Sequence, residues 1–277
     1  MRRLEEIELF VMDMDGTIYL ENQLIEGAKE WITLLQENNR KFVFLTNNSS
    51  KSAKDYQDKL DRLGIKCELD QIFTSGMAMG MFLNENYPKQ SIYLVGTKAL
   101  EKELKEYGVS FSDSNPQIVV VGYDRELNYE KIEKACAFLD EGATFLATNI
   151  DLVYPVAKNK YLPDCASICA MLTNATKKEP LYIGKPSRKM LDLLAGKYKI
   201  ANDKIAMVGD RIYTDIATAY HAGSLSVLVL SGETKKEDIM FSSIQPDLVF
   251  TSVNELKEAL KKVISLKKSC TFYQDKV

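Results

Sequence analysis

Histidine is almost missing from this chain, with His221 the single one among 277 residues. Zinc hydrolases hold their metal with several histidines, and a Ser-His-Asp triad needs a histidine beside its serine. Both kinds of active site therefore fit this sequence poorly. Hydrolytic chemistry here has to rest on carboxylates, hydroxyl groups and lysine.

Cysteine is scarce as well, and the five cysteines form no CxxC pair and no cluster with histidine. Such a scattered, odd number is typical of free thiols in a reducing compartment, so neither a disulfide framework nor a thiolate metal site is indicated. The apolar run Leu9–Met12 near the start is too short for a signal peptide or a membrane span. We therefore expect a cytoplasmic protein that does not enter a membrane.

The chain also lacks an excess of basic residues, since 36 Lys and Arg face 39 Asp and Glu and the net charge is -3. No stripe of Lys and Arg is interleaved with aromatic residues, so a nucleic-acid partner is not expected. The length and the 45% hydrophobic content allow one large or two medium domains with a proper core.

Short apolar runs alternate with segments of helical spacing along most of the chain. The runs typical of buried strands are Ile7–Met12, Phe42–Leu45, Ile92–Val95, Ile118–Gly122, Ala143–Thr148, Leu181–Ile183, Ile205–Val208, Val227–Leu230 and Leu248–Phe250. The segments with helical spacing are Ala28–Asn38, Ala53–Leu63, Leu100–Tyr107, Tyr129–Leu139, Ala166–Asn174, Lys189–Tyr198, Ile216–His221 and Asn254–Val263. The stretch Asn149–Asp164, rich in Tyr, Pro, Asn and Asp, is expected to be a loop. This alternation predicts an α/β fold, a parallel sheet with helices on both faces.

Two acidic residues, Asp13 and Asp15, directly follow the first apolar run. Ligands of open parallel sheets bind at the carboxyl ends of strands, and residues i and i+2 of an extended segment project to the same side. The two carboxylates would repel each other, and a hard cation such as Mg²⁺ relieves this beside a phosphate. An EF-hand calcium loop is a poor alternative, because Val11 and Ile18 stand where it needs an oxygen ligand and a glycine.

Two further polar segments follow predicted strands. Thr46-Asn47-Asn48-Ser49-Ser50 precedes a helix, where a hydroxyl and backbone N–H groups can form an anion cradle, although taken alone the segment is better explained as a simple helix cap. Gly184-Lys185-Pro186-Ser187 lies between a strand and a helix whose start the proline would preset. The flanking glycine and proline favour a fixed position for the charge of Lys185 over a solvated lysine.

A fourth motif begins at Gly209 and Asp210, after Ile205–Val208. Asp210 can supply a third carboxylate to the pocket of Asp13. Thr214 is expected to cap the next helix, and Asp215 in its first turn would either complement the helix dipole or assist the metal. Each motif alone is a weak to moderate indication of function. The four motifs in this order, each after a predicted strand, together strongly indicate one functional site.

With these four motifs the sequence resembles the haloacid dehalogenase-like (HAD) superfamily of phosphohydrolases. The TNNSS form of the second motif, and about a hundred residues inserted before the third, are similar to the NagD / para-nitrophenyl phosphatase branch. The resemblance implies a Rossmann-like doubly wound core of residues 1–78 and 180–277, with an inserted α/β cap domain of residues 79–179. It also implies a Mg²⁺-dependent phosphatase that acts on a small phosphorylated metabolite.

The resemblance assigns a role to each motif residue. It makes Asp13 the nucleophile and Asp15 the general acid and base, with Asp15 also offering its backbone carbonyl to the metal. The residues implied to hold the phosphoryl group are Thr46, the backbone of Asn47, and Lys185. The residues implied to bind Mg²⁺ are Asp13, Asp15, Asp210 and, as an auxiliary ligand, Asp215.

The cap is expected to contact the leaving group of the substrate. The candidate contacts are Asn149, Asp151, Tyr154, Tyr161 and Asp164, each of which could equally be an ordinary loop residue. A sugar phosphate is favoured, while a nucleoside monophosphate and pyridoxal phosphate stay open. The oligomeric state is open too, with exposed cap surfaces as the place for a homodimer contact.

Two other functions share these motifs. A phosphomutase on the same fold would use both aspartates, and a non-catalytic phosphometabolite sensor would keep the binding residues. A dehalogenase has no need of Asp15, a P-type pump would need membrane spans, and a response-regulator receiver is much shorter and lacks a cap. Measurable turnover would separate an enzyme from every binding-only alternative.

Overall fold

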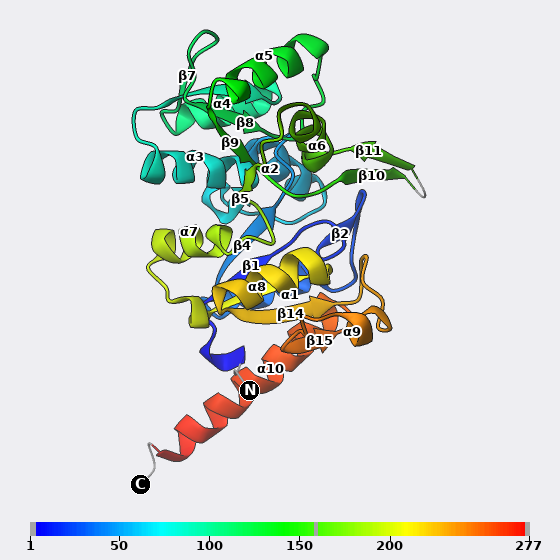
Figure 1. Ribbon diagram of the computed structural model, residues 1–277. Coiled ribbons are helices and arrows are strands. Elements are labelled where there is room, and N and C mark those ends of the chain that lie inside the picture. Colours follow the sequence, from blue (N-terminus) through cyan, green and yellow to red (C-terminus); the bar gives the residue numbers. More distant parts are fainter. Residues whose placement is uncertain (1–3, 158–159, 275–277) are drawn as a thin grey trace. The chain divides into compact units, whose positions relative to one another are not determined.

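The computed structural model describes residues 4–157 and 160–274 (Figure 1). The chain forms two compact units. The first contains the residues up to 45, residues 59–71 and the residues from 194 onward; the second contains residues 46–58 and 72–193. The core and cap boundaries implied at residues 78 and 180 stay a prediction.

A parallel sheet forms the centre of the first unit, with the strand order β15-β14-β13-β1-β4. The strands are β1 Leu9–Met12, β4 Lys41–Thr46, β13 Ile205–Gly209, β14 Leu225–Val229 and β15 Leu248–Phe250. All residues of β1, β13 and β14 are buried, as expected for parallel strands covered on both faces. Met12 of β1 lies opposite Val208 of β13, so the carboxyl ends of these two strands are level.

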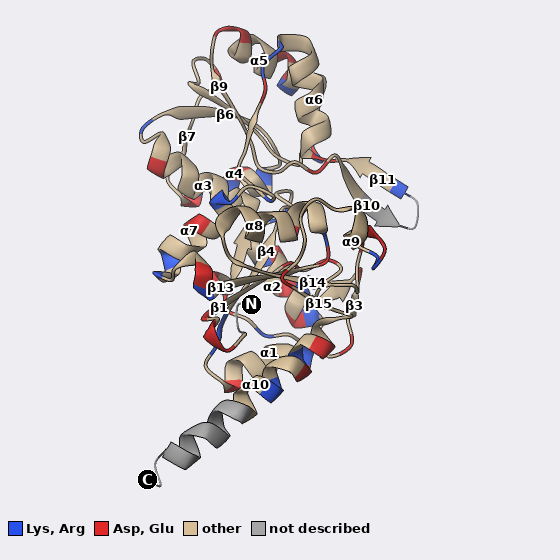
Figure 2. Cartoon of the chain, turned by 60° about the horizontal axis from the view of Figure 1, so that its bottom comes forward, with Lys and Arg blue, Asp and Glu red and all other residues tan. Residues whose placement is uncertain are grey.

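Helices cover both faces of this sheet, with α8 Ala217–Ala222 on one face and α1 Ala28–Glu37 with α10 Val253–Gln274 on the other (Figure 2). Helix α1 buries the apolar positions that recur every three to four residues. Among them Trp31 meets the ring of Phe10 edge-on at 5.3 Å between centroids, and its Nε1 donates to Met12 Sδ at 3.1 Å. Helix α1 therefore holds strand β1 on this face of the sheet, directly before Asp13 and Asp15.

The first unit also contains smaller elements. These are the hairpin β2 Tyr19–Leu20 with β3 Gln23–Leu24, helix α9 Asp238–Phe241, the 3₁₀ turns Leu4–Glu6, Leu69–Gln71 and Asn202–Lys204, and the π-helical turn η4 Ile212–Ile216.

The second unit has its own parallel sheet, with the order β12-β9-β8-β6-β7. Its strands are β6 Ser91–Val95, β7 Ser110–Phe111, β8 Ile118–Val121, β9 Thr144–Ala147 and β12 Leu181–Tyr182. Its helices are α3 Ser75–Asn86, α4 Lys98–Glu106, α5 Tyr129–Asp140 and α6 Cys165–Thr176, and β5 Ile72–Thr74 precedes α3. Helix α7 Lys189–Tyr198 begins in this unit and ends in the first. Helices α5 and α6 share one apolar core with the residues of β6, β8 and β9 that face them. Helix α2 Ala53–Arg62 begins in this unit.

The predicted doubly wound α/β architecture is confirmed, and most strands and helices lie within a residue or two of the expected ranges. The stretch Asn149–Asp164 is not all loop, since it contains the antiparallel hairpin β10 Val153–Ala157 and β11 Lys160–Pro163. Apolar and polar residues do not alternate regularly in these two segments of the sequence, so no strand pattern was visible there. Helix α10 continues well past the predicted end at Val263. No helix in the described part of the chain is long and apolar enough to cross a bilayer.

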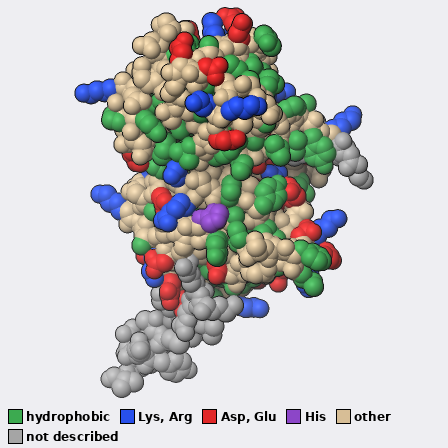
Figure 3. Space-filling model, viewed as in Figure 1, with side chains coloured by type: hydrophobic (Ala, Val, Ile, Leu, Met, Phe, Trp, Pro, Cys, Tyr) green, Lys and Arg blue, Asp and Glu red, His purple; other side chains and the backbone are tan. Residues whose placement is uncertain are grey.

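Charged side chains of both signs are interspersed on the face shown in Figure 3, with no band of Lys and Arg. This agrees with the near-balanced charge of the sequence.

Candidate active site

Three carboxylates of the first unit come together at the ends of neighbouring strands. Asp13 follows β1 and Asp210 follows β13, and the N–H of Asp13 continues the strand ladder by donating to the carbonyl of Val208 at 2.8 Å. Asp215 returns to the same place from η4. One oxygen atom from each of the three residues lies within 4.8 Å of the others. Like charges at this spacing repel, so the group gains from a cation with oxygen ligands.

One backbone N–H and one side-chain hydroxyl hold the Asp210 carboxylate in position. Its Oδ2 accepts from the N–H of Glu233 at 2.7 Å, and its Oδ1 lies 3.4 Å from the hydroxyl of Thr17. Its backbone carbonyl accepts from the N–H of Thr234 at 3.2 Å. Asp210 is 2% exposed, and these donors take the place of the water that its carboxylate would otherwise bond to.

Glycines surround the carboxylates where a side chain would collide with them. A Cβ on Gly16 or Gly232 would come within 2.4 Å or 2.0 Å of Asp210 Oδ2, and a Cβ on Gly209 within 2.3 Å of the Asp215 side chain. Gly16 also has φ +86°, a left-handed conformation that turns the chain away after Asp15. The glycines that the sequence places in both acidic motifs thus leave room for the acids themselves.

The fourth motif differs from its prediction in one respect. Thr214 does not cap a helix, because η4 already starts at Ile212 and contains it. Asp215 Oδ2 instead accepts from the N–H of Arg211 at 3.0 Å, at the start of this turn. Asp215 therefore satisfies the donor at the start of this turn and belongs to the carboxylate group, while its part in metal binding stays a prediction.

Arg211 adds a positive charge beside these acids, and its Nε forms an ion pair with Glu233 Oε2 at 2.9 Å. Burial opposes its charge, but the groups of Tyr213, Glu233, Asp13 and Asp210 raise the pKa of Arg211 overall. The sequence prediction gave Arg211 no role.

Asp15 is exposed, and its carboxylate is not one of the three that come together. It lies in the turn that Gly16 closes by donating its N–H to the carbonyl of Tyr19 at 2.8 Å. Asp15 lies three residues beyond the buried end of β1, and its exposure lets a ligand reach it from outside the carboxylate group.

The loop after Thr46 belongs to the second unit and is not a helix cap. Thr46 Oγ1 accepts from the N–H of Asn48 at 3.1 Å, whereas α2 begins later, behind a capping pair of Ser52 and Asp55. Lys185 follows β12 and is 3% exposed, and its backbone N–H donates to Asn47 Oδ1 at 2.8 Å. The structure thus brings the second and third motifs together within this unit.

The five residues predicted to contact substrate have different surroundings. Asn149 is buried and donates from Nδ2 to the carbonyl of Asn47 at 2.7 Å, and Asp151 accepts from Asn47 Nδ2 at 3.0 Å. Asp164 is buried and caps α6, accepting from the N–H of Cys165 at 2.5 Å. Tyr154 is half-buried, and Tyr161 is exposed on β11.

Comparison with known proteins agrees with this geometry. A family model described as haloacid dehalogenase-like hydrolase matches residues 10–110, and a HAD-hydrolase-like model matches residues 182–256. The ribonucleotide monophosphatase NagD of Escherichia coli K12 is 31% identical over 90% of this chain and 98% of its own length. The chain belongs to the haloacid dehalogenase-like hydrolases.

Two further relatives place the chain within this family. Phosphoglycolate phosphatase 1A of Arabidopsis thaliana is 34% identical over 91% of this chain and 77% of its own length. The crystal structure of a 4-nitrophenylphosphatase from Thermotoga maritima matches with a TM-score of 0.88 at 39% identity, over 92% of this chain and 98% of that one. The predictions of a HAD hydrolase of the NagD / para-nitrophenyl phosphatase branch, and of an enzyme of the phosphatase type, are confirmed.

One polar group of this HAD hydrolase was missed by the sequence prediction. Tyr123 is 2% exposed, its ring tilts against Tyr154 at 5.5 Å, and its hydroxyl has no hydrogen-bond partner within residues 4–157 and 160–274. Burial, and then the Asp164 carboxylate, raise the pKa of Tyr123, which keeps the hydroxyl protonated. Tyr123 follows β8 by two residues, so the rule that found the four motifs could have found it too.

Proposed function

We propose that this chain is a Mg²⁺-dependent phosphomonoester hydrolase that transfers the phosphoryl group of a small metabolite to Asp13 and then to water. The observation that carries the proposal is the group formed by Asp13, Asp210 and Asp215 at the ends of adjacent parallel strands. A group of three carboxylates, two of them buried, has little use in stabilising a fold, because their repulsion opposes it.

The donor set fits a hard divalent cation, since all three ligand atoms are carboxylate oxygens and sit close enough to share one ion. Asp13, Asp210 and the backbone carbonyl of Asp15 would bind the Mg²⁺, with Asp215 as the auxiliary ligand. The bound cation would supply positive charge to the phosphoryl oxygens.

Asp13 attacks phosphorus in line, and the bond from phosphorus to the ester oxygen breaks. Asp15 donates its proton to the leaving oxygen, so the alcohol departs neutral. Asp15, now ionised, takes a proton from the water that attacks the aspartyl-phosphate, which releases inorganic phosphate and restores both acids. The hydroxyl of Thr46, the N–H of Asn47 and the ammonium group of Lys185 hold the transferring oxygens.

A sugar phosphate is the substrate class we favour, with nucleoside monophosphates and pyridoxal phosphate next. The names of similar proteins support small phosphorylated metabolites in general: an acid sugar phosphatase of Staphylococcus saprophyticus, the 5'-nucleotidase YutF of Bacillus subtilis and a dihydroxyacetone phosphatase of Corynebacterium glutamicum. We further propose a cytoplasmic enzyme with neither a nucleic-acid nor a membrane partner, and a homodimer as the state to test first.

The test is release of nitrophenol from para-nitrophenyl phosphate by the wild type and by Asp13→Asn, each with Mg²⁺ and with EDTA. Asp203→Asn, a change of the same kind at an exposed position, is the matched control. The proposal predicts turnover that needs both Asp13 and Mg²⁺ and that survives Asp203→Asn. Absence of turnover in every condition would favour the phosphomutase or the sensor instead.

A further inference from the structure

The backbone of Lys185 is held by the side chain of a residue 138 positions earlier. Asn47 Nδ2 donates to the Lys185 carbonyl at 3.1 Å, and Asn47 Oδ1 accepts from the Lys185 N–H at 2.8 Å. The two bonds join one amide to both polar backbone atoms of a single residue. Such a bidentate contact fixes direction as well as position.

The amide of Asn47 is itself held from other sides. Its Nδ2 also donates to Asp151 Oδ2 at 3.0 Å, so both of its hydrogens are used. Its backbone carbonyl accepts from Ser75 Oγ at 2.5 Å and from Asn149 Nδ2 at 2.7 Å. Asn47 is 7% exposed, and a side chain so enclosed and fully bonded has little freedom to rotate.

Gly184 allows the two segments to approach this closely. A Cβ at this position would come within 2.7 Å of Asn47 Oδ1 and 2.4 Å of the Thr148 carbonyl. The N–H of Gly184 donates to that same carbonyl at 2.8 Å, which ties the segment to the end of β9. Lys185 is therefore fixed between a strand end on one side and Asn47 on the other.

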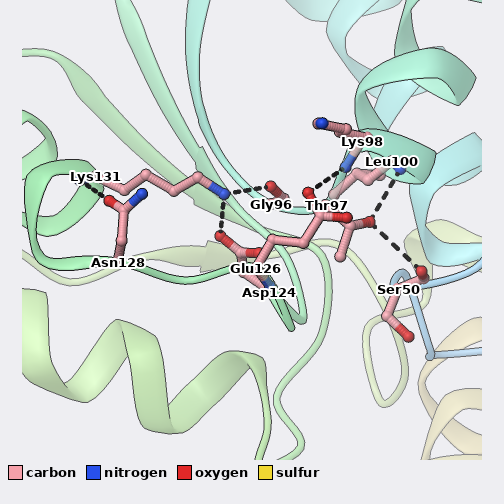
Figure 4. A network of polar contacts seen from close by, with 9 residues as sticks. All are labelled: Ser50, Gly96, Thr97, Lys98, Leu100, Asp124, Glu126, Asn128 and Lys131. Atoms are coloured by element: carbon pink, nitrogen blue, oxygen red, sulfur yellow. Dashed lines mark hydrogen bonds and ion pairs between the residues drawn. The ribbon is translucent and has the colours of Figure 1, made fainter.

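The other end of the Asn47 loop is anchored to strand ends of the same unit. Ser49 Oγ accepts from the N–H of Tyr123 at 2.9 Å and lies 3.0 Å from Thr148 Oγ1. The carbonyl of Ser50 accepts from Thr97 Oγ1 at 3.4 Å, and Thr97 caps α4 (Figure 4). The loop is thus held at both ends.

We propose that the side chain of Asn47 is a positioning residue for Lys185, fixing the lysine backbone so that its ammonium group lies where the phosphoryl charge develops. This rests on the proposed phosphatase function. Lysine carries its charge on a flexible four-carbon stem, so its backbone is the part that the fold can fix. The role differs from the predicted phosphoryl contact of Asn47, which uses the backbone N–H.

A side chain that acts through Lys185 has no effect once the lysine is gone. The experiment compares Asn47→Ala in the wild type and in a Lys185→Ala background, using para-nitrophenyl phosphate and Mg²⁺. We expect Asn47→Ala to lower kcat/KM about 100-fold in the wild type, the cost of a misplaced group near the chemistry. In the Lys185→Ala background we expect a further change below about threefold.

Asn48→Ala is the matched control, because Asn48 is the neighbouring amide of the same loop and bonds to Ser50 within it. Its effect should be equal with and without the lysine. An equal loss from Asn47→Ala in both backgrounds would overturn the inference. Wild-type turnover by Lys185→Ala would instead contradict the role of the lysine in the proposed function.

Amide hydrogen exchange of the folded protein tests the contact without any turnover. The Lys185 N–H should exchange at least about tenfold faster in Asn47→Ala than in the wild type, because its acceptor is removed. Asn48→Ala should leave this exchange rate as it is. Unchanged exchange in Asn47→Ala would show that the amide does not hold Lys185, whatever the activity.

Discussion

Both units are built on parallel sheets with polar residues after the strands, yet the two sets of strand ends carry different chemistry. In the first unit the strand ends bear Asp13 and Asp210, which Asp215 joins, and glycines leave room around them. In the second they bear amides, hydroxyls and Lys185, which bond to one another. The acidic set gains from a cation, whereas the amides and hydroxyls named for the second set already bond to one another or to nearby backbone atoms. Under the proposed function, one architecture would provide a metal site in the first unit and phosphoryl-binding groups in the second through the residues placed at its strand ends.

The largest expected effect comes from neutralising one acid of the first unit. Asp210→Asn keeps the shape of the side chain but weakens cation binding, so we expect kcat/KM to fall about 1,000-fold at fixed Mg²⁺. The measurement is a Mg²⁺ titration of para-nitrophenyl phosphate turnover, in which the half-saturating concentration should rise. A half-saturating concentration equal to that of the wild type would remove Asp210 from the metal site.

A buried carboxylate of the second unit is expected to affect stability instead. Glu103 accepts from Thr74 Oγ1 at 2.7 Å and from the N–H of Ala53 at 3.3 Å, but burial outweighs these bonds and raises its pKa to about 7 from 4.5. The native state therefore keeps a proton that the unfolded state loses, and the wild type loses stability as the pH rises from 4.5 to about 7. Relative to the wild type, Glu103→Gln should gain about 3 kcal/mol across this range.

Urea unfolding of both proteins at about pH 5 and about pH 8 measures this difference. Glu133→Gln, at an exposed glutamate of the same unit, controls for the substitution itself. A stability difference that is the same at both pH values would mean that Glu103 is ionised throughout. Glu103 of the second unit would then differ less from the acids of the first unit than we argue.

A smaller effect is expected from a side chain added at Gly232, in the space beside the Asp210 carboxylate. Gly232→Ala would push against Asp210 Oδ2, whereas Gly196→Ala meets nothing within 4 Å. We expect Gly232→Ala to weaken Mg²⁺ affinity about 10- to 100-fold, as disturbed support of a metal ligand does. Calorimetric Mg²⁺ binding compares the two variants, and equal affinities would show that the carboxylate adapts without cost.

The smallest expected effect concerns the hydroxyl of Tyr123. Removing an unsatisfied buried hydroxyl should raise the free energy of unfolding of Tyr123→Phe by about 1 kcal/mol. If this hydroxyl meets the leaving group, kcat/KM should fall about tenfold for a sugar phosphate and stay unchanged for para-nitrophenyl phosphate. If Tyr123→Phe changes kcat/KM by the same factor for both substrates, the hydroxyl has no part in substrate recognition.

Much of the fold and the motif positions could be predicted because both depend on local signals. Apolar runs marked β1 and β13, and the acids directly after them marked the carboxylate group. Helix α3 escaped prediction because it is apolar on most sides and contains Gly76 and Gly80, which usually argue against a helix. These glycines make room for Glu103 of α4 and for Tyr107 directly after it, which no local pattern reveals.

The contacts among the motifs could not be predicted for the same reason. The pairing of Asn47 with Lys185 joins residues 138 positions apart, and the sequence shows only that each follows a strand. Asn149 and Asp151 were predicted to contact substrate, which stays a prediction, and the structure shows that they bond to Asn47. Which strand ends of a unit meet is set by sheet order, and short apolar runs do not encode that order.

The central claim is that Asp13 carries the phosphoryl group, and trapping the intermediate tests it most directly. Asp15→Asn should accumulate it with para-nitrophenyl phosphate, because nitrophenolate leaves without a proton while the second step lacks its base. Borohydride reduction followed by peptide mass spectrometry should then find homoserine at position 13. Turnover by this variant with an unmodified Asp13, or with the modification at another residue, would contradict the account.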